Sequence, residues 1–211
     1  MTIPSRLLVF GATGRTGRRV VAAAVRRGVP VGVFVRDAGR APAGAQEVHL
    51  GDVRDPAQVR AAVREGDVVV SALGGQPSDA EGGVVRDGGR QLAETARANG
   101  ASRLLGVVGA GVLQRDATRQ RHQAEDYPAV FRGIGAEHEA LHRSFRDAGI
   151  GWALVCTPRL VDAEPTARMI ALADYLPDGT GTVTTGDVAE LLLDLATAPI
   201  PRTGRFGVNT R

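Results

Sequence analysis

A glycine-rich segment directly after the first apolar run constrains the fold of this chain more than any other feature. The run Leu7–Phe10 leads into a GxxGxxG segment that ends in Gly17, and a helical pattern begins near Arg15. The glycines let the backbone turn tightly and approach a pyrophosphate, and the helix start directs unpaired N–H groups and a positive dipole end at that anion. The segment predicts a dinucleotide-binding loop. Its expected cofactor contacts are Gly11, Thr13, Gly14, Arg15, Thr16 and Gly17.

The composition fits a sheet covered by helices on both faces and excludes several kinds of chemistry. The length of 211 residues suits one domain, and 43% hydrophobic with only 4% aromatic residues suits an interior of Val, Leu and Ala. All 26 residues in the Lys and Arg total are arginine. The absence of lysine excludes a Walker phosphate loop, a Schiff-base enzyme and the Tyr-x-x-x-Lys pair of ordinary short-chain dehydrogenases.

Charge, cysteine content and hydropathy predict the partners and the cellular compartment of the protein. The net charge is +3, but arginines alternate with acidic residues instead of forming a basic block, so we expect no nucleic acid partner. Cys156 is the only cysteine, which excludes an intramolecular disulfide, and its place in an apolar run predicts an inert buried thiol. Without a signal peptide or a long apolar stretch, we expect a cytoplasmic protein, monomeric or homodimeric, that does not contact a membrane.

Apolar runs alternate with amphipathic stretches along most of the chain. This alternation predicts an α/β fold, a single-domain Rossmann-like doubly wound parallel sheet with helices on both faces, in which residues 157–211 supply the substrate side. Residues 112–132 have no clear period and predict a surface loop, which we expect over the pocket. The expected strands are 6–10, 31–35, 47–50, 67–72, 103–108, 151–156, 182–185 and 204–208, and the expected helices are 15–28, 56–65, 84–99, 134–149 and 188–196.

Residues after the second and third expected strands indicate which dinucleotide binds. An acidic residue after the second strand is typical of NAD sites, whereas this chain has Arg36 there, which favours the 2′-phosphate of NADP. Asp37 follows, so NADP(H) is the preferred cofactor and NAD(H) stays open. After the third strand, Asp52 is expected to accept a hydrogen bond from the adenine amino group while Val53 packs on the ring. The alternative is that Asp52 or Asp55 only caps a turn or helix.

Small and apolar residues are expected to form the nicotinamide end of the site. Leu73, Gly74 and Gly75 follow the fourth strand, where missing side chains let the backbone pass close to the cofactor. We assign Gly109, after the fifth strand, and Pro158, after the sixth, to the same end.

Taken together, these segments resemble the atypical short-chain dehydrogenase/reductase group that includes NmrA-like proteins and the biliverdin reductase B (flavin reductase) family. The resemblance spans nearly the whole chain and rests on LLVFGATGRTGRRVV, VFVRD, GDVRD, VVVSALGG, EHEALHRSFRDAGIGWALVCTPRLVD and TTGDVAELLLDLA. It implies an NADP-binding Rossmann domain and hydride transfer to a flavin-, biliverdin- or quinone-like acceptor, which is a small aromatic molecule.

Departures from the family pattern bear on activity. Biliverdin reductase B has a serine after the fifth strand and a histidine after the sixth, where this chain has Val107-Val108-Gly109-Ala110 and Thr157-Pro158-Arg159. No side chain is recognisable as a general acid. Flavin reduction needs little acid catalysis, because ring positioning supplies much of the rate and solvent delivers the proton. Arg159 is a candidate for binding an anionic substrate group, and the rival interpretation is an NmrA-like sensor that binds NADP without turnover.

One motif points to a different chemistry. His138-Glu139-Ala140-Leu141-His142 satisfies HExxH, which on a helix sets two imidazoles on one face and suggests a zinc hydrolase. The same residues fit an outer helix that packs through Leu141 and Phe145, and no convincing third ligand is evident. We therefore expect no metal. Tyr127, in the long loop, is a further candidate for contact with a substrate ring.

Overall fold

The computed structural model describes residues 5–75 and 83–211. Its elements follow one another in this order: β1 (Leu7–Phe10), α1 (Arg15–Arg26), β2 (Val31–Val35), η1 (Ala38–Arg40), β3 (Glu47–Leu50), α2 (Pro56–Ala62), β4 (Val68–Ser71), α3 (Val84–Ala98), β5 (Arg103–Gly109), η2 (Ala110–Val112), η3 (Arg121–Gln123), η4 (Ala129–Phe131), α4 (Arg132–Asp147), β6 (Gly151–Thr157), β7 (Arg159–Val161), β8 (Met169–Ala173), β9 (Thr182–Thr184), α5 (Thr185–Thr197) and β10 (Gly204–Thr210).

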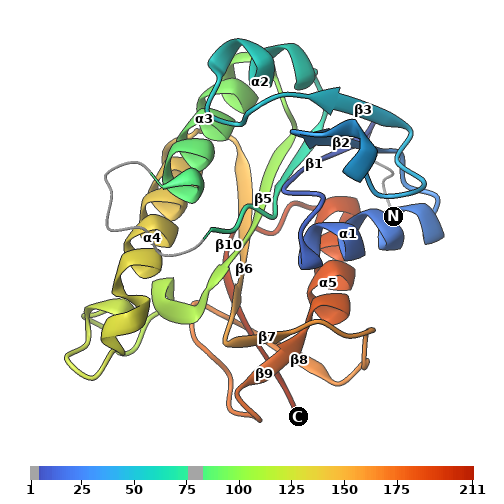
Figure 1. The fold of residues 1–211 in the computed structure, drawn as a ribbon. Helices are drawn as coiled ribbons and strands as arrows, with labels where there is room; N and C mark the ends of the chain where they lie inside the picture. Colours follow the sequence, from blue (N-terminus) through green and yellow to red (C-terminus); the bar gives the residue numbers. More distant parts are fainter. Residues whose placement is uncertain (1–4, 76–82) are drawn as a thin grey trace.

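The main sheet has eight strands in the order β3-β2-β1-β4-β5-β6-β10-β8. Helices α1 and α5 cover one face, and α2, α3 and α4 cover the other (Figure 1). Each face has its own apolar core, and the fully buried β-strand residues Leu7 and Leu8 point to opposite ones. The predicted doubly wound fold is confirmed.

The carboxyl-terminal third differs from the predicted pattern. Strand β8 was not predicted, and it pairs antiparallel with β10, whereas the other neighbouring pairs of the main sheet are parallel. The segment after Pro158 was not predicted as a strand either, but it forms β7, which pairs with β9 in a separate two-stranded sheet. Both strands are short and partly exposed, so neither has the continuous apolar run by which a buried parallel strand is recognised.

Helix α2 ends earlier than its apolar pattern predicts. It was expected over 56–65 but stops at Ala62, and the side-chain amide of Asn99 donates hydrogen bonds to the carbonyls of Arg60 and Val63 at 2.9 and 2.7 Å. The guanidinium of Arg6 binds the Ala62 carbonyl at 2.8 Å. These partners come from distant parts of the chain, so the helix end depends on tertiary contacts.

The segment 112–132 contains the short turns η3 and η4 and ends at the start of α4. Within the described residues, no helix is long and apolar enough to cross a bilayer.

Two glycines fix the turn between β1 and α1. Gly11 has φ +78°, and a Cβ there would lie against the carbonyl of Ala72 at the end of β4. Gly17 is buried in the first turn of α1, where a Cβ would meet the Gly11 carbonyl oxygen. Both neighbours are backbone atoms, which have little freedom to move away. The helix therefore begins directly beside the ends of β1 and β4.

Replacing Gly17 by alanine is expected to lower the free energy of unfolding by about 1 to 3 kcal/mol, because the new methyl group overpacks a contact between backbone segments. Urea denaturation measures this change. Gly74→Ala is the matched control, since a Cβ at Gly74 would meet no atom within 4 Å. Equal stability of the two variants would contradict the packing role of Gly17.

Candidate functional site

A cleft of about 770 Å³ lies at the carboxyl ends of the parallel strands. This is the edge at which open α/β sheets bind ligands, and the volume is typical of small-molecule sites. Most of the predicted cofactor residues line it: Gly11, Thr13, Gly14, Arg15, Thr16, Arg36, Asp52, Val53, Leu73, Gly74, Gly75 and Gly109.

The start of α1 forms the middle of the cleft. Gly14 is the N-cap, it makes no side-chain capping bond, and the first helical turn contains no acidic residue. The N–H groups of this turn are therefore not capped by a side chain, and the helix dipole places positive charge at the same point. An anionic phosphate fits this part of the cleft.

Charged residues line one end of the cleft. Arg54 donates to the two Asp52 carboxylate oxygens at 3.1 and 2.8 Å, and its backbone N–H binds the same carboxylate. These hydrogen bonds lower the pKa of Asp52 to about 2, so the carboxylate is ionised at neutral pH. Asp55 accepts from the N–H groups of Ala57 and Gln58 and caps α2, whereas Asp52 caps the preceding turn through the Arg54 N–H.

The opposite end of the cleft is apolar except for two side chains. Val107, Val108 and Leu160 line it together with His138 and Thr157. The Nδ1 atom of His138 accepts a hydrogen bond from the backbone N–H of Gly109 at 3.1 Å. Burial lowers the pKa of His138 to about 4, so the imidazole is neutral at pH 7.

Helix α4 supports two walls of the cleft with consecutive residues. Next to His138, the buried carboxylate of Glu137 accepts a hydrogen bond from the Val85 N–H at 3.2 Å, at the start of α3. Val84, one residue earlier in α3, lines the cleft. One turn of α4 thus binds both the end of β5 and the start of α3.

The HExxH residues are divided between different environments. His138 faces the cleft, whereas His142 is buried, with its Nδ1 atom 3.2 Å from Glu139 and its ring 5.4 Å from the ring of Trp152. In residues 5–75 and 83–211, no three His, Cys, Asp or Glu side chains are grouped as a metal site requires. Because the Nδ1 lone pair of His138 accepts the Gly109 N–H and the neutral ring carries its proton on Nε2, His138 has no free lone pair for zinc.

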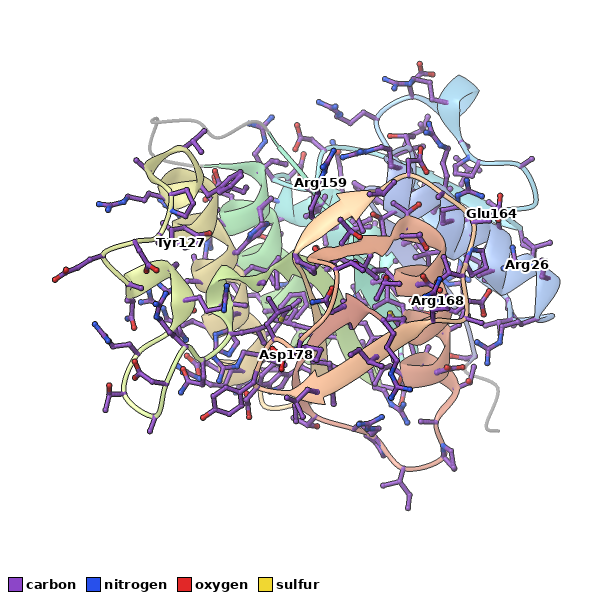
Figure 2. The ribbon with its side chains drawn as sticks, turned by 90° about the horizontal axis from the view of Figure 1, so that it is seen from below. Arg26, Tyr127, Arg159, Glu164, Arg168 and Asp178 are labelled. Atoms are coloured by element: carbon purple, nitrogen blue, oxygen red, sulfur yellow. The ribbon has the colours of Figure 1, made fainter. Side chains whose placement is uncertain are left out.

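Several residues singled out from the sequence lie outside the cleft lining. Gly17 is buried beneath the loop, and Pro158 and Arg159 are absent from the lining although Thr157 and Leu160 on either side belong to it. Arg159 is exposed on β7 (Figure 2), so its contact with a substrate group stays a prediction. Residues 112–132 contribute nothing to the lining, contrary to expectation. The hydroxyl of Tyr127 (labelled in Figure 2) instead lies against Gly111 and Gly135, and none of these three residues lines the cleft.

Half of the residues that line the cleft were not predicted as site residues from the sequence, and His138 is one of them. His138 precedes the core residues Leu141 and Phe145 by three and seven positions, which places it on the sheet-facing side of α4. The helix begins at the carboxyl edge of the sheet, so a sheet-facing residue in its first half points to the cleft. The helical spacing of His138 from Leu141 and Phe145 could therefore have predicted its place in the cleft. The residues missed are Phe10, Phe34, Val35, Gly51, Arg54, Ala72, Val84, Val107, Val108, His138, Thr157 and Leu160.

A family of proteins described as NAD(P)H-binding matches residues 11–199. The chain belongs to this family. Membership agrees with the resemblance of the sequence motifs and confirms the expectation of a nicotinamide cofactor. A curated relative, the isoflavone reductase homologue IRL of Zea mays, is 40% identical over 83 residues, which cover 33% of this chain and 26% of the relative. The chain therefore matches about a quarter of that protein.

Solved structures share the fold over almost the whole chain. A provisionally named exported protein from Burkholderia pseudomallei has a TM-score of 0.80 at 27% identity and covers 97% of this chain and 98% of its own. A provisionally named NADH-flavin reductase from Streptococcus pneumoniae has a TM-score of 0.83 at 21% identity, with 98% and 99% covered. The anaerobillin reductase ChuY of Escherichia coli O157:H7 has a TM-score of 0.80 at 23% identity, with 98% and 97% covered.

The low pKa of His138 predicts a specific dependence of stability on pH. An unfolded histidine binds a proton below its ordinary value of 6.5, whereas folded His138 binds one only near pH 4. The unfolded state is thus protonated first, and the free energy of unfolding falls as pH decreases through this window. Denaturation at pH 7 and pH 4 should show a loss in the wild type that exceeds the loss in His138→Phe by about 2 to 3 kcal/mol. Equal losses in the two proteins would show that His138 titrates normally.

Proposed function

We propose that this protein is an NADPH-dependent reductase that transfers a hydride to a flavin-, biliverdin- or quinone-like acceptor. The observation that carries the proposal is the change in chemical character along the cleft. Charged side chains such as Arg36 and Asp52 line one end, the start of α1 lies in the middle, and the end at Leu160 is apolar. An extended cofactor with an anionic half and an aromatic, reactive half matches this order. The names of the flavin reductase and anaerobillin reductase neighbours support the acceptor class.

The residues of the cleft suit each part of the cofactor. The uncapped start of α1 would hold the pyrophosphate, and Val53 and Asp52 would hold the adenine. Gly74 and Gly75 would allow close approach of the backbone to the ring that reacts. When bound, reduced nicotinamide supplies a hydride, which is two electrons with one proton.

A preference for NADP over NAD rests on three side chains. Arg15, at the start of α1, and Arg36, after β2, both line the cleft, and a 2′-phosphate bound between them would contact two cations. Asp37, the residue that kept NAD open, accepts a hydrogen bond from the Gly39 N–H at 2.9 Å and is not part of the cleft lining. Its carboxylate therefore caps η1 and is directed to the backbone of its own turn.

Arg36→Ala is expected to weaken NADPH binding by about 1.5 to 3 kcal/mol and NADH binding far less, because a charged hydrogen bond to the 2′-phosphate is lost. Fluorescence titration with both cofactors measures the difference. Arg40→Ala is the matched control, since Arg40 is exposed four residues further on and outside the cleft lining. Equal weakening of both cofactors by Arg36→Ala would contradict the assignment.

Turnover is tested by following nicotinamide absorbance with NADPH and FMN, riboflavin, biliverdin or a naphthoquinone. We expect oxidation above the background rate with at least one acceptor. Tight NADP binding without turnover of any of these acceptors would favour the NmrA-like sensor. That alternative rests on the absence of a catalytic serine, tyrosine or lysine from the sequence segments assigned to the apolar end. Failure to bind either dinucleotide would contradict both.

A further inference from the structure

His138 presents one nitrogen to the apolar end of the cleft in a fixed protonation state. A backbone N–H can only donate, so the bond from Gly109 requires the unprotonated Nδ1 atom and leaves the proton of the neutral ring on Nε2. Among the described residues, no hydrogen bond to this Nε2 atom is present. The imidazole is therefore held at one nitrogen and offers an N–H donor at the other.

The neighbouring polar side chain does not offer the same group. The hydroxyl of Thr157 donates to the Val108 carbonyl at 3.3 Å, which directs its proton into the sheet. The other side chains that line this end, including Val107 and Leu160, are apolar. In the described part of the chain, His138 is thus the side-chain donor at the end where the acceptor is expected.

We propose that the Nε2–H of His138 donates a hydrogen bond to a carbonyl oxygen of the acceptor, one that is conjugated with the atom receiving the hydride. This inference rests on the proposed reductase function and specifies its acceptor, which must carry a carbonyl conjugated with the atom that receives the hydride. Isoalloxazine rings, quinones and bilins, whose lactam carbonyls are conjugated with the bridging methine carbons, share this feature.

The electron balance explains why a donor is useful at this position. The acceptor gains a hydride at one atom of its conjugated system, and the nicotinamide is oxidised because it loses the same two electrons. Negative charge then moves through the conjugated system to the carbonyl oxygen. A hydrogen-bond donor already held in place stabilises this charge most effectively. The reduced acceptor takes its second proton from water. His138 stays neutral throughout, since loss of the Nε2 proton would leave an imidazolate.

The fixed orientation of the ring supports this role. His138 is anchored by a backbone amide at the end of β5 and is carried by a helix that also binds the start of α3. A donor held in this way needs no reorganisation when charge develops on the acceptor. Its lowered pKa, caused by burial, keeps the donor form present across the neutral range.

Two substitutions separate the hydrogen bond from the shape of the side chain. His138→Phe keeps an aromatic ring and removes both nitrogens, whereas His138→Gln keeps one acceptor for Gly109 and one N–H donor. His122→Phe is the matched control, because His122 bonds to the Gly111 carbonyl and is outside the cleft lining. With NADPH and a naphthoquinone, kcat should fall about 10- to 100-fold in His138→Phe and recover largely in His138→Gln.

Two comparisons identify the partner of the donor. The Kd of NADPH in all three variants should stay within about twofold of the wild-type value, because the proposed hydrogen bond of His138 is made to the acceptor and not to the cofactor. With methylene blue, a ring acceptor without a carbonyl oxygen, His138→Phe should react as fast as the wild type. A loss of NADPH affinity with kcat unchanged would assign His138 to the cofactor instead, and an equal loss with methylene blue would overturn the carbonyl contact.

A measurement without turnover distinguishes failure of this inference from failure of the proposed function. Imidazole ¹⁵N spectra of the protein with NADP⁺ should show His138 as the neutral Nε2–H form, and oxidised FMN should shift the Nε2 resonance. An Nδ1–H form, or no response at saturating FMN, overturns the inference even if the protein is a reductase. If the wild type reduces no acceptor but Nε2 responds to FMN, the contact stands and the proposed reaction fails.

Discussion

The contact between Gly17 and the Gly11 carbonyl is the constraint on which the cleft depends. A first turn of α1 that lies directly on the β1 turn is possible only without side chains at these two positions. The same close packing brings the helix start beside the end of β4, where the Ala72 carbonyl leaves no room for a Cβ on Gly11. The position proposed for the phosphate is therefore set by steric exclusion, and the helix dipole that would attract an anion acts at a point that packing has already fixed.

The two ends of the cleft are maintained by different forces. At the charged end, Asp52 and Arg54 satisfy each other in an exposed pair, which solvent screens and which a ligand can rearrange at modest cost. At the apolar end, the backbone N–H of Gly109 donates a hydrogen bond to the imidazole of His138 in a partly buried site. In the proposed reaction, recognition of the nucleotide would tolerate an adaptable surface, whereas hydride transfer would require atoms held in place. The adaptable charged end and the rigid apolar end of the cleft agree with that proposal.

A feature of this structure can be predicted from the sequence when the residues that determine it are neighbours in the chain. The glycine loop and the alternation of strands and helices follow from residues adjacent in the chain, and they were predicted. The cap at Asp55 is equally local, and it had been considered as the alternative role of Asp52 or Asp55. The end of α2 was not predicted, because the side chain that caps it, Asn99, lies 36 positions from Val63. Strand β8 depends on pairing with β10, and the place of His138 depends on the sheet against which α4 packs. The sequence motif offered only zinc binding as a function for His138, which was not adopted, and gave no sign of its hydrogen-bond partner Gly109, which is 29 residues away.

The position of Cys156 gives the molecule a built-in reporter of large-scale opening. Its thiol is fully buried on β6, in register with Val108 of β5 on one side and Gly207 of β10 on the other, and burial raises its pKa far above the ordinary range. A thiol reagent can reach this sulfur only when the central strands separate, since fraying of the loops around the cleft leaves it covered. The rate of alkylation would then track the exchange between closed and unfolded chains, and a ligand that binds across the sheet edge would slow it.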